Sequence, residues 1–383
     1  MRKYAAQNIP LQRTGGLALL APAAERGVMR TWSDEARCKP KMRCRHANAG
    51  TERRPTMPRR MVKSLLIALV TASITSLSSA SFGQTFARME LRPIESATLT
   101  GEQFLTGDKN GKLALLAGEL RIPKPGTDRL PAVILVHGSG GISASADRWA
   151  QELNAIGVAS FILDSFSGRG IVNTQTDQSQ LNSLAMMVDA YRALASLAGH
   201  SRIDPTRIAV MGFSKGAVAA VYSSSERFRK LHGPANVQFA AHIGLYTPCN
   251  VRYFQDDKTS GKPIRMFHGI ADDYVSIEPC RAYAERLKKA AADVALAEYA
   301  DAHHAYDVFY IAQPIKFPQA QTTRRCWLEE GQKGQILNSK TGTPYDLNDS
   351  CVEKGPQVAY NAAAHQATVG AVKEFLAATF RLQ

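Results

Sequence analysis

The sequence RIAVMGFSKG occupies residues 207–216. Its first half is a largely apolar run, typical of a strand buried in a sheet. Its second half matches G-x-S-x-G, the pattern of a sharp turn that raises a serine hydroxyl above the end of a strand. The glycines on both sides of the serine allow this turn, which a Cβ atom would obstruct. The stretch therefore predicts a strand, a tight turn at Ser214 and a helix that begins at Lys215.

Apolar runs alternate with amphipathic stretches from residue 113 onward, which predicts an α/β fold with a mostly parallel sheet covered by helices on both faces. The predicted strands are 113–122 (as an edge strand), 132–136, 158–163, 208–211, 239–245, 264–267 and 294–299. The predicted helices are 147–156, 180–198, 215–230, 278–291 and 360–380. No period of about 20–50 residues repeats, so a solenoid or propeller is not expected.

A polar stretch rich in Gly and Pro, residues 313–357, interrupts this alternation and holds two cysteines. We expect it to be a disulfide-stapled excursion. The four cysteines after residue 83 allow three pairings, and their spacing favours Cys249–Cys280 and Cys326–Cys351. Four reduced, buried thiols are the alternative. A metal site is less favoured because no C-x-x-C pair occurs.

Most of the positive charge lies in the first 60 residues. The formal net charge is +14, of which residues 1–60 carry +10 and residues 61–383 carry +4. A basic chain suggests a nucleic-acid partner, but this distribution does not support one for the remainder. We expect no nucleic-acid binding.

Residues 57–83 have the pattern of a secretory signal peptide: basic residues, an apolar stretch over 64–77, then small residues. The apolar stretch is shorter than the roughly 20 residues that a membrane span needs. A buried helix is the alternative reading. We expect a periplasmic or secreted protein in which residues 1–56 are an upstream over-translation or disordered leader and residues 84–383 form the mature domain.

Two loops after predicted strands supply an acid and a base. The sequence HGIADD occupies residues 268–273, and DAHHAYD occupies residues 301–307. The order serine, aspartate, histidine is that of the α/β-hydrolase triad. The serine turn and these two loops all follow predicted strands. In such sheets the catalytic groups lie at the carboxyl ends of the strands.

A glycine-rich loop, HGSGG at residues 137–141, follows another predicted strand. Its glycines let the backbone come close to a reacting carbonyl group. We expect the backbone N–H groups of Ser139 and Lys215 to form an oxyanion hole.

With these motifs together, the chain resembles the dienelactone hydrolase family of α/β-hydrolases over roughly residues 100–383. The matching stretches are 136–141, 163–166, 203–208, 212–216, 268–273 and 302–307. The resemblance implies Ser214 as nucleophile, His304 rather than His303 as base, and Asp272 rather than Asp273 as the acid. Dienelactone hydrolases proper carry cysteine as the nucleophile, whereas this chain has Ser214. The serine therefore favours a general hydrolase of esters or lactones over an enzyme specific for dienelactone.

Two further residues could have either a functional or a purely structural role. Arg169 either binds a substrate carboxylate or braces a loop, and His137 is expected to be structural. We expect no cofactor and no metal, and a small-molecule ester or lactone as partner. The other functional hypotheses are a prolyl-oligopeptidase-type peptidase and a catalytically silent envelope binding protein.

Overall fold

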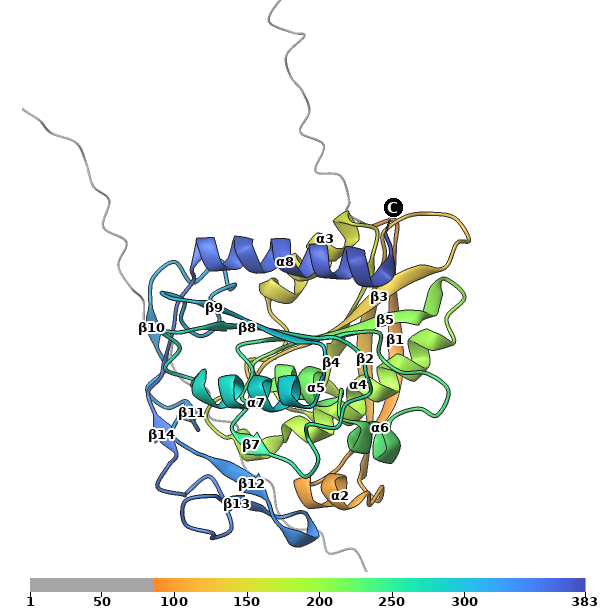
Figure 1. Ribbon diagram of the computed structural model, residues 1–383. Coiled ribbons are helices and arrows are strands. Elements are labelled where there is room, and N and C mark those ends of the chain that lie inside the picture. The colour runs from red at the N-terminus through yellow and green to blue at the C-terminus, as the bar shows by residue number, and fades with distance from the viewer. Residues whose placement is uncertain (1–85, 383) are drawn as a thin grey trace, which may run out of the picture. The chain divides into compact units, whose positions relative to one another are not determined.

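The computed structural model describes residues 86–382 (Figure 1), so the predicted leader and signal peptide lie outside the described residues. An eight-stranded sheet runs in the order β1-β2-β4-β3-β5-β6-β8-β9. Its strands are β1 (Arg88–Thr98), β2 (Lys112–Ile122), β3 (Leu130–Val136), β4 (Ala159–Asp164), β5 (Ile203–Phe213), β6 (His242–Leu245), β8 (Ile264–Gly269) and β9 (Val294–Tyr299). From β4 to β9 all neighbours are parallel, whereas β2 is antiparallel to both β1 and β4.

Helices cover both faces of the sheet, as the alternating pattern predicts (Figure 1). One face packs against α3 (Ala144–Ala155) and α8 (Ala362–Phe380). The other packs against α2 (Gly101–Thr106), α4 (Ser183–Ala198), α5 (Lys215–Tyr222), α6 (Glu226–His232) and α7 (Glu278–Lys289). The chain thus has an α/β-hydrolase fold, and the prediction of its fold class is confirmed.

Strand β3 shows why a continuous apolar run marks a central strand. All seven of its residues are buried. Val133 and Leu135 belong to the core under α3 and α8, whereas Ile134 and Val136 belong to the core under α4 and α5. Both faces are covered, so no position of this strand favours a polar side chain.

The prediction that residues 113–122 form an edge strand is wrong. Strand β2 lies between β1 and β4, and β1 is the edge. Few residues of β1 are buried, so its apolar periodicity is weak. Pro93 lies within β1, where the missing N–H is tolerated because an edge strand has an unpaired side.

The helix expected over residues 215–230 is interrupted. Helix α5 ends at Tyr222, and α6 begins at Glu226 after three serines. The Ser223 hydroxyl donates to the carbonyl oxygen of Ala220 (2.7 Å), and the Ser225 hydroxyl accepts from the N–H of Phe228 at the start of α6. Serine side chains compete for backbone groups in this way and favour helix ends.

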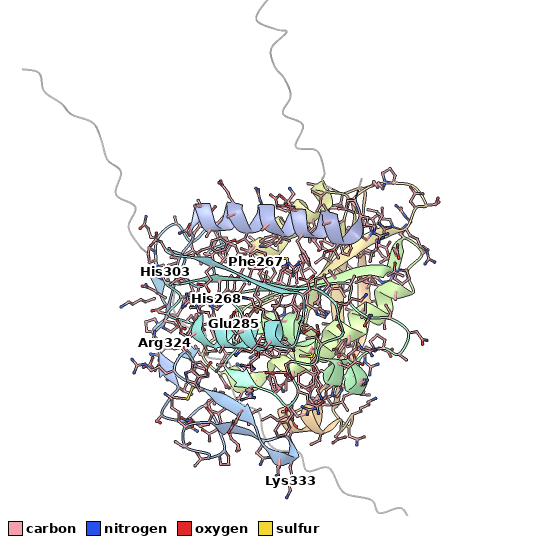
Figure 2. All side chains as sticks on the ribbon, viewed as in Figure 1. Phe267, His268, Glu285, His303, Arg324 and Lys333 are labelled. Atoms are coloured by element: carbon pink, nitrogen blue, oxygen red, sulfur yellow. A yellow bond between two sulfur atoms is a disulfide. The ribbon has the colours of Figure 1, made fainter. Side chains whose placement is uncertain are left out.

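The excursion over residues 313–357 contains only short elements: β10 (Ile315–Lys316), β11 (Gln321–Thr322), β12 (Leu328–Glu330), the 3₁₀ turn Gln332–Gly334, β13 (Ile336–Asn338) and β14 (Glu353–Lys354). Figure 2 shows Lys333 at its far end. Strand β12 pairs with β7 (Val251–Arg252) of the main fold, whereas β10 pairs with β15 (Gln357–Val358) and joins the start of the excursion to its end. Val358 also forms a bridge with His304, which ties that end to the main fold.

Both expected cysteine pairs are at disulfide distance. The Cα atoms of Cys249 and Cys280 are 4.9 Å apart, and those of Cys326 and Cys351 are 5.0 Å apart. The first pair joins the segment after β6 to α7, and the second closes the excursion. Within residues 86–382, no helix combines the length and apolar character that a membrane crossing requires.

Candidate active site

Ser214 lies on a strained turn between β5 and α5. Its φ of 50° is in the left-handed region, which is unfavourable for a residue with a side chain. The flanking glycines are required sterically: a Cβ atom on Gly212 would overlap the carbonyl oxygen of Gly216, and one on Gly216 would overlap that of Val136. The turn predicted from the G-x-S-x-G pattern is therefore present.

Ser214, His304 and Asp272 form a continuous chain of hydrogen bonds. The Oγ atom of Ser214 is 3.0 Å from Nε2 of His304, and Nδ1 of His304 is 2.8 Å from Oδ2 of Asp272. The three residues follow β5, β9 and β8, so the parallel sheet brings them to one edge. All are separated by at least 32 positions in the sequence.

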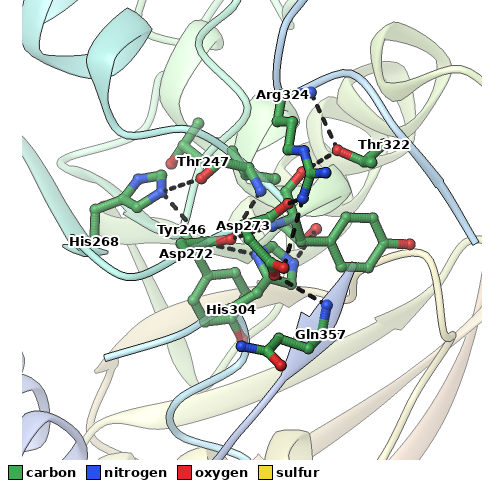
Figure 3. Close-up of polar contacts among 12 residues, drawn as sticks. Tyr246, Thr247, His268, Asp272, Asp273, His304, Thr322, Arg324 and Gln357 are labelled. Atoms are coloured by element: carbon green, nitrogen blue, oxygen red, sulfur yellow. Dashed lines mark hydrogen bonds and ion pairs between the residues drawn. The ribbon is translucent and has the colours of Figure 1, made fainter. Parts of the chain in front are cut away.

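The neighbouring residues that the sequence offered as alternatives are engaged elsewhere. Oδ1 of Asp273 accepts from the N–H of Gln357 (3.0 Å), and Nδ1 of His303 is 3.3 Å from the side-chain amide of Gln357. Figure 3 shows His304 next to Asp272, with Asp273 turned toward Arg324 and Gln357. The structure thus brings together Asp272 and His304, and not Asp273 and His303.

The Asp272 carboxyl group is buried and held in its ionised form. Its Oδ1 accepts from the N–H groups of Tyr274 (2.9 Å) and Val275 (2.8 Å). Burial alone would raise the pKa of Asp272, but His304 and His268 outweigh it and hold the pKa well below its usual range. Nε2 of His268 is 3.4 Å from Oδ2 of Asp272. The sequence analysis used His268 only as part of a motif and did not predict this contact.

Two tyrosines enclose the His304 ring. The ring centroids of Tyr246 and Tyr274 lie 4.6 Å and 4.7 Å from that of His304. The Tyr246 hydroxyl donates to the buried Asp307 (2.8 Å), which also accepts from the indole N–H of Trp149 (2.7 Å). These contacts fix the imidazole plane from both sides. No local sequence pattern marks either tyrosine.

The glycine-rich loop after β3 approaches the serine closely. A Cβ atom on Gly138 would lie 3.3 Å from Cβ of Ser214, so a side chain there would crowd the site. The Ser139 N–H is not a donor in any backbone hydrogen bond found within residues 86–382. The Lys215 N–H is at the first position of α5, where an amide has no partner in its own helix. Lys215 directly follows Ser214 in the chain, and Ser139 directly follows Gly138 in the loop that approaches Ser214, so both N–H groups remain candidates for the oxyanion hole.

The side chain of His137 bonds the glycine-rich loop to the segment that follows β4. Its Nε2 accepts from the N–H of Ser165 (3.2 Å), so Nδ1 carries the proton and donates to the carbonyl oxygen of Gly138 (2.8 Å). Burial lowers the pKa of His137, which favours this neutral form. The expected structural role of His137 agrees with these contacts.

The ammonium group of Lys215 is buried beneath this loop, which the sequence did not indicate. Its Nζ donates to Oε1 of Gln178 (2.9 Å), to the Gln178 carbonyl oxygen (3.1 Å) and to Oγ1 of Thr174 (3.2 Å). Gln178 in turn donates to the hydroxyl of Ser139 (3.1 Å), and the N–H of Thr174 donates to the Ser139 carbonyl oxygen (2.8 Å). The lysine side chain therefore braces the segment that positions Ser139.

Replacing Lys215 by methionine is expected to change the pH dependence of stability. Burial lowers the pKa of Lys215 from 10.5 to about 7. Between these values the folded lysine is neutral while the unfolded one is charged, so unfolding takes up a proton and wild type gains stability as the pH rises. The difference in unfolding free energy, wild type minus Lys215→Met, should therefore increase from pH 7 to pH 10, as measured by urea denaturation. A difference that stays constant over this range would contradict the lowered pKa of the buried Lys215 amine.

Of the two interpretations expected for Arg169, its contacts agree with the bracing of a loop, and it is not among the residues that line the cavity beside Ser214. Its guanidinium makes a bidentate pair with the buried Asp189 on α4, with both distances 2.8 Å. It also donates to the hydroxyl of Thr98 and to the carbonyl oxygen of Ser165, each at 2.7 Å. With its donors used in this way, Arg169 ties the loop after β4 to α4 and β1.

A cavity of about 430 Å³ opens beside Ser214. It is lined by the glycine-rich loop, by Phe213, Tyr246, Tyr274 and His304, and by residues that follow His304 in the chain. A reactive carbonyl group held in this cavity would meet the serine hydroxyl, the histidine and the two backbone N–H groups. The arrangement is that of a site for nucleophilic acyl transfer.

Solved structures that resemble the chain are hydrolases at low identity. They include a dienelactone hydrolase-like promiscuous phosphotriesterase from metagenomic libraries, at 14% identity over 76% of this chain and 99% of that one, with a TM-score of 0.48. A thermophilic esterase from Thermogutta terrifontis shares 19% identity over 50% of this chain and 79% of its own, with a TM-score of 0.40. An α/β-hydrolase from a Medee basin deep-sea metagenome shares 21% identity over 58% and 85%, also with a TM-score of 0.40.

No curated protein matches the chain. The model of the dienelactone hydrolase family matches residues 116–327, which is more than half of the chain. The match runs from β2 through the cysteine Cys326 and contains the serine turn, the aspartate loop and the histidine loop. The chain therefore belongs to the dienelactone hydrolase family.

Proposed function

We propose that this protein is a serine hydrolase that cleaves a carboxylic ester or lactone. The observation that carries the proposal is the unbroken hydrogen-bond chain from Ser214 through His304 to Asp272 at the wall of a cavity. Membership of the dienelactone hydrolase family supports a hydrolase acting on a small molecule. The nucleophile is a hydroxyl rather than a thiol, so its activation depends on His304 as base.

In the acylation step, Nε2 of His304 accepts the proton of Ser214 while Oγ attacks the substrate carbonyl carbon. Asp272 accepts the Nδ1–H of His304, holds the productive tautomer and stabilises the imidazolium. The negative charge that develops on the carbonyl oxygen is met by the N–H groups of Ser139 and Lys215. One such donor contributes about 3 to 4 kcal/mol to the transition state.

Collapse of the tetrahedral intermediate breaks the ester bond, and the leaving alcohol takes the proton from His304. The acyl group remains on Ser214. His304 then accepts a proton from a water molecule, which attacks the acyl carbonyl carbon. Collapse of this second tetrahedral intermediate breaks the bond between the acyl carbon and Oγ, His304 returns the proton to Oγ of Ser214, and the acid leaves. Apart from substrate and water, these steps use only groups of this chain.

The direct experiment is hydrolysis of 4-nitrophenyl butyrate by the purified protein. A hydrolase is expected to release 4-nitrophenolate with saturation kinetics and to be inactivated by a fluorophosphonate. A protein that is folded by circular dichroism yet gives neither result would contradict the proposal and favour a binding role instead.

We also propose that the protein is exported by the signal peptide read at residues 57–83. The two cysteine pairs at disulfide distance support an oxidising compartment. Thiol titration of the natural protein, denatured without reductant, is expected to find no free thiol among Cys249, Cys280, Cys326 and Cys351. Four titratable thiols would contradict export to such a compartment.

A further inference from the structure

No carboxylate, ammonium or guanidinium group lines the cavity beside Ser214. Among the described residues that line it, none is Asp, Glu, Lys or Arg, and the histidines are His137 and His304. Its polar groups are neutral: serine hydroxyls, the side chain of Gln175 and tyrosines. Such groups can bond a neutral oxygen atom, but they supply no counter-ion for a charged substrate.

The far wall of the cavity is apolar and comes from the segment after His304 and from the excursion. Its side chains are Val308, Tyr310, Ile311, Ile315, Phe317 and Val358. Tyr310 and Ile315 are about half exposed, at 54% and 45% of their surface, and form an apolar rim. Together with the apolar wall, they offer an alkyl chain in the cavity a surface on which it can leave water.

The apolar wall is held against the catalytic residues by packing and hydrogen bonds, so a bound substrate would contact its side chains. Val358 packs with Tyr274 and Ala320 in a small buried cluster. The hydroxyl of Thr322 donates to the Tyr274 carbonyl oxygen (2.6 Å), and the N–H of Gln321 donates to the carbonyl oxygen of Gln175 (3.0 Å). The excursion is thereby bonded to the aspartate loop on one side and to the segment beneath the oxyanion loop on the other.

Lys215, Arg169 and Arg324, three cationic side chains near the site, are already engaged, and Lys316 does not line the cavity. Lys215 donates to the segment of residues 174–178, and Arg169 pairs with Asp189. Arg324 pairs with Glu353 and donates to the carbonyl oxygen of Asp273 (2.7 Å), on the side away from His304 (Figure 3). The Asp272 carboxylate, bonded to Nδ1 of His304, is negatively charged and would repel an anionic substrate.

We propose that the site selects uncharged esters with an apolar acyl group and discriminates against substrates that carry a carboxylate. This inference rests on the proposed hydrolase function. A carboxylate that enters the cavity loses its hydration without gaining a cation, which is strongly unfavourable. An alkyl chain gains by leaving water, at about 0.8 kcal/mol for each CH₂ buried.

The test compares two esters with the same acyl chain, one charged and one neutral, which differ otherwise by a single methyl group. These are the 4-nitrophenyl monoester of adipic acid, which is an anion at pH 7.5, and its methyl ester, which is neutral. We expect kcat/KM to be about 100-fold higher for the neutral ester, because the charged acyl group has no partner in the cavity. Equal turnover of the two would overturn the inference and leave the hydrolase function standing. Absence of turnover and of fluorophosphonate labelling would overturn both.

A cation placed in the wall should weaken the preference for the neutral ester. Ile315 is exposed enough for Ile315→Arg to fold, and Ile315→Gln is the matched neutral control. The arginine variant is expected to raise kcat/KM for the anionic ester at least about 10-fold, because guanidinium pairs with carboxylate bidentately. The glutamine variant, which carries no charge, is expected to give no comparable rise. Equal behaviour of the two variants would show that the wall does not meet the acyl group and would overturn the inference.

Discussion

Replacing Ser214 by alanine is expected to lower kcat/KM for 4-nitrophenyl butyrate by about 10⁴-fold to 10⁶-fold, because the nucleophile that forms the acyl-enzyme is removed. The residual rate comes from the oxyanion donors and from substrate binding, which the substitution leaves in place. The loss should appear in kcat, since the cavity that binds the substrate keeps its shape. Steady-state kinetics at pH 7.5 measures both parameters.

Ser143→Ala is the matched control for this prediction. Ser143 also lines the cavity, and its hydroxyl caps no helix amide although it precedes α3. Its loss should change kcat/KM by less than about fivefold, in keeping with a surface polar substitution. A Ser214→Ala variant as active as Ser143→Ala would contradict the assigned nucleophile.

Replacing Asp272 by asparagine is expected to lower kcat by about 10³-fold to 10⁴-fold while leaving the fold intact. The asparagine NH₂ would donate to Nδ1 of His304 in place of accepting from it. Nε2 would then carry the proton and face Ser214 as a donor, so it could not accept the serine proton. Oδ1 of the new side chain could still accept from the N–H groups of Tyr274 and Val275, which keeps the loop in place.

The control is the same substitution one residue along the chain. Asp273 accepts from the Gln357 N–H and makes no hydrogen bond to His304 among the described residues. Asp273→Asn should therefore change kcat by less than about threefold. A larger loss from Asp273→Asn than from Asp272→Asn would reverse the assignment of the acid. Circular dichroism and the melting temperature verify that both variants are folded.

The parts of this site that the sequence predicts are those with local signals. The turn at Ser214 needs two glycines at fixed positions, because their Cβ atoms would overlap backbone oxygen atoms. The loops of Asp272 and His304 follow apolar runs, and parallel strands bring such loops to one edge. Strand β3 is similarly evident because burial on both faces leaves no polar position.

The partners of buried charges could not be predicted in this way. Arg169 meets Asp189 because the loop after β4 lies against α4, which depends on the packing of the whole fold. The same holds for Lys215, whose contacts with Thr174 and Gln178 cross about 40 positions of sequence. Nothing in the local pattern separates a surface lysine at a helix start from a buried one.

The limits of secondary structure prediction also have physical causes here. The serines at 223–225 interrupt a helix whose apolar periodicity continues past them, since Phe228 of α6 is buried in the same core as α5. Strand β1 was missed because an edge strand with one covered face carries only a few buried residues. The pattern of apolar residues shows neither the hydrogen bonds of the serines to the backbone nor the position of β1 at the edge of the sheet.

The central claim is that Ser214 is the nucleophile. Its most direct test is to treat the protein with a fluorophosphonate, digest it and locate the adduct by mass spectrometry. The account predicts one adduct of stoichiometry near one, on the peptide that contains Ser214, and none in Ser214→Ala. An adduct on another residue, or equal labelling of the alanine variant, would contradict it.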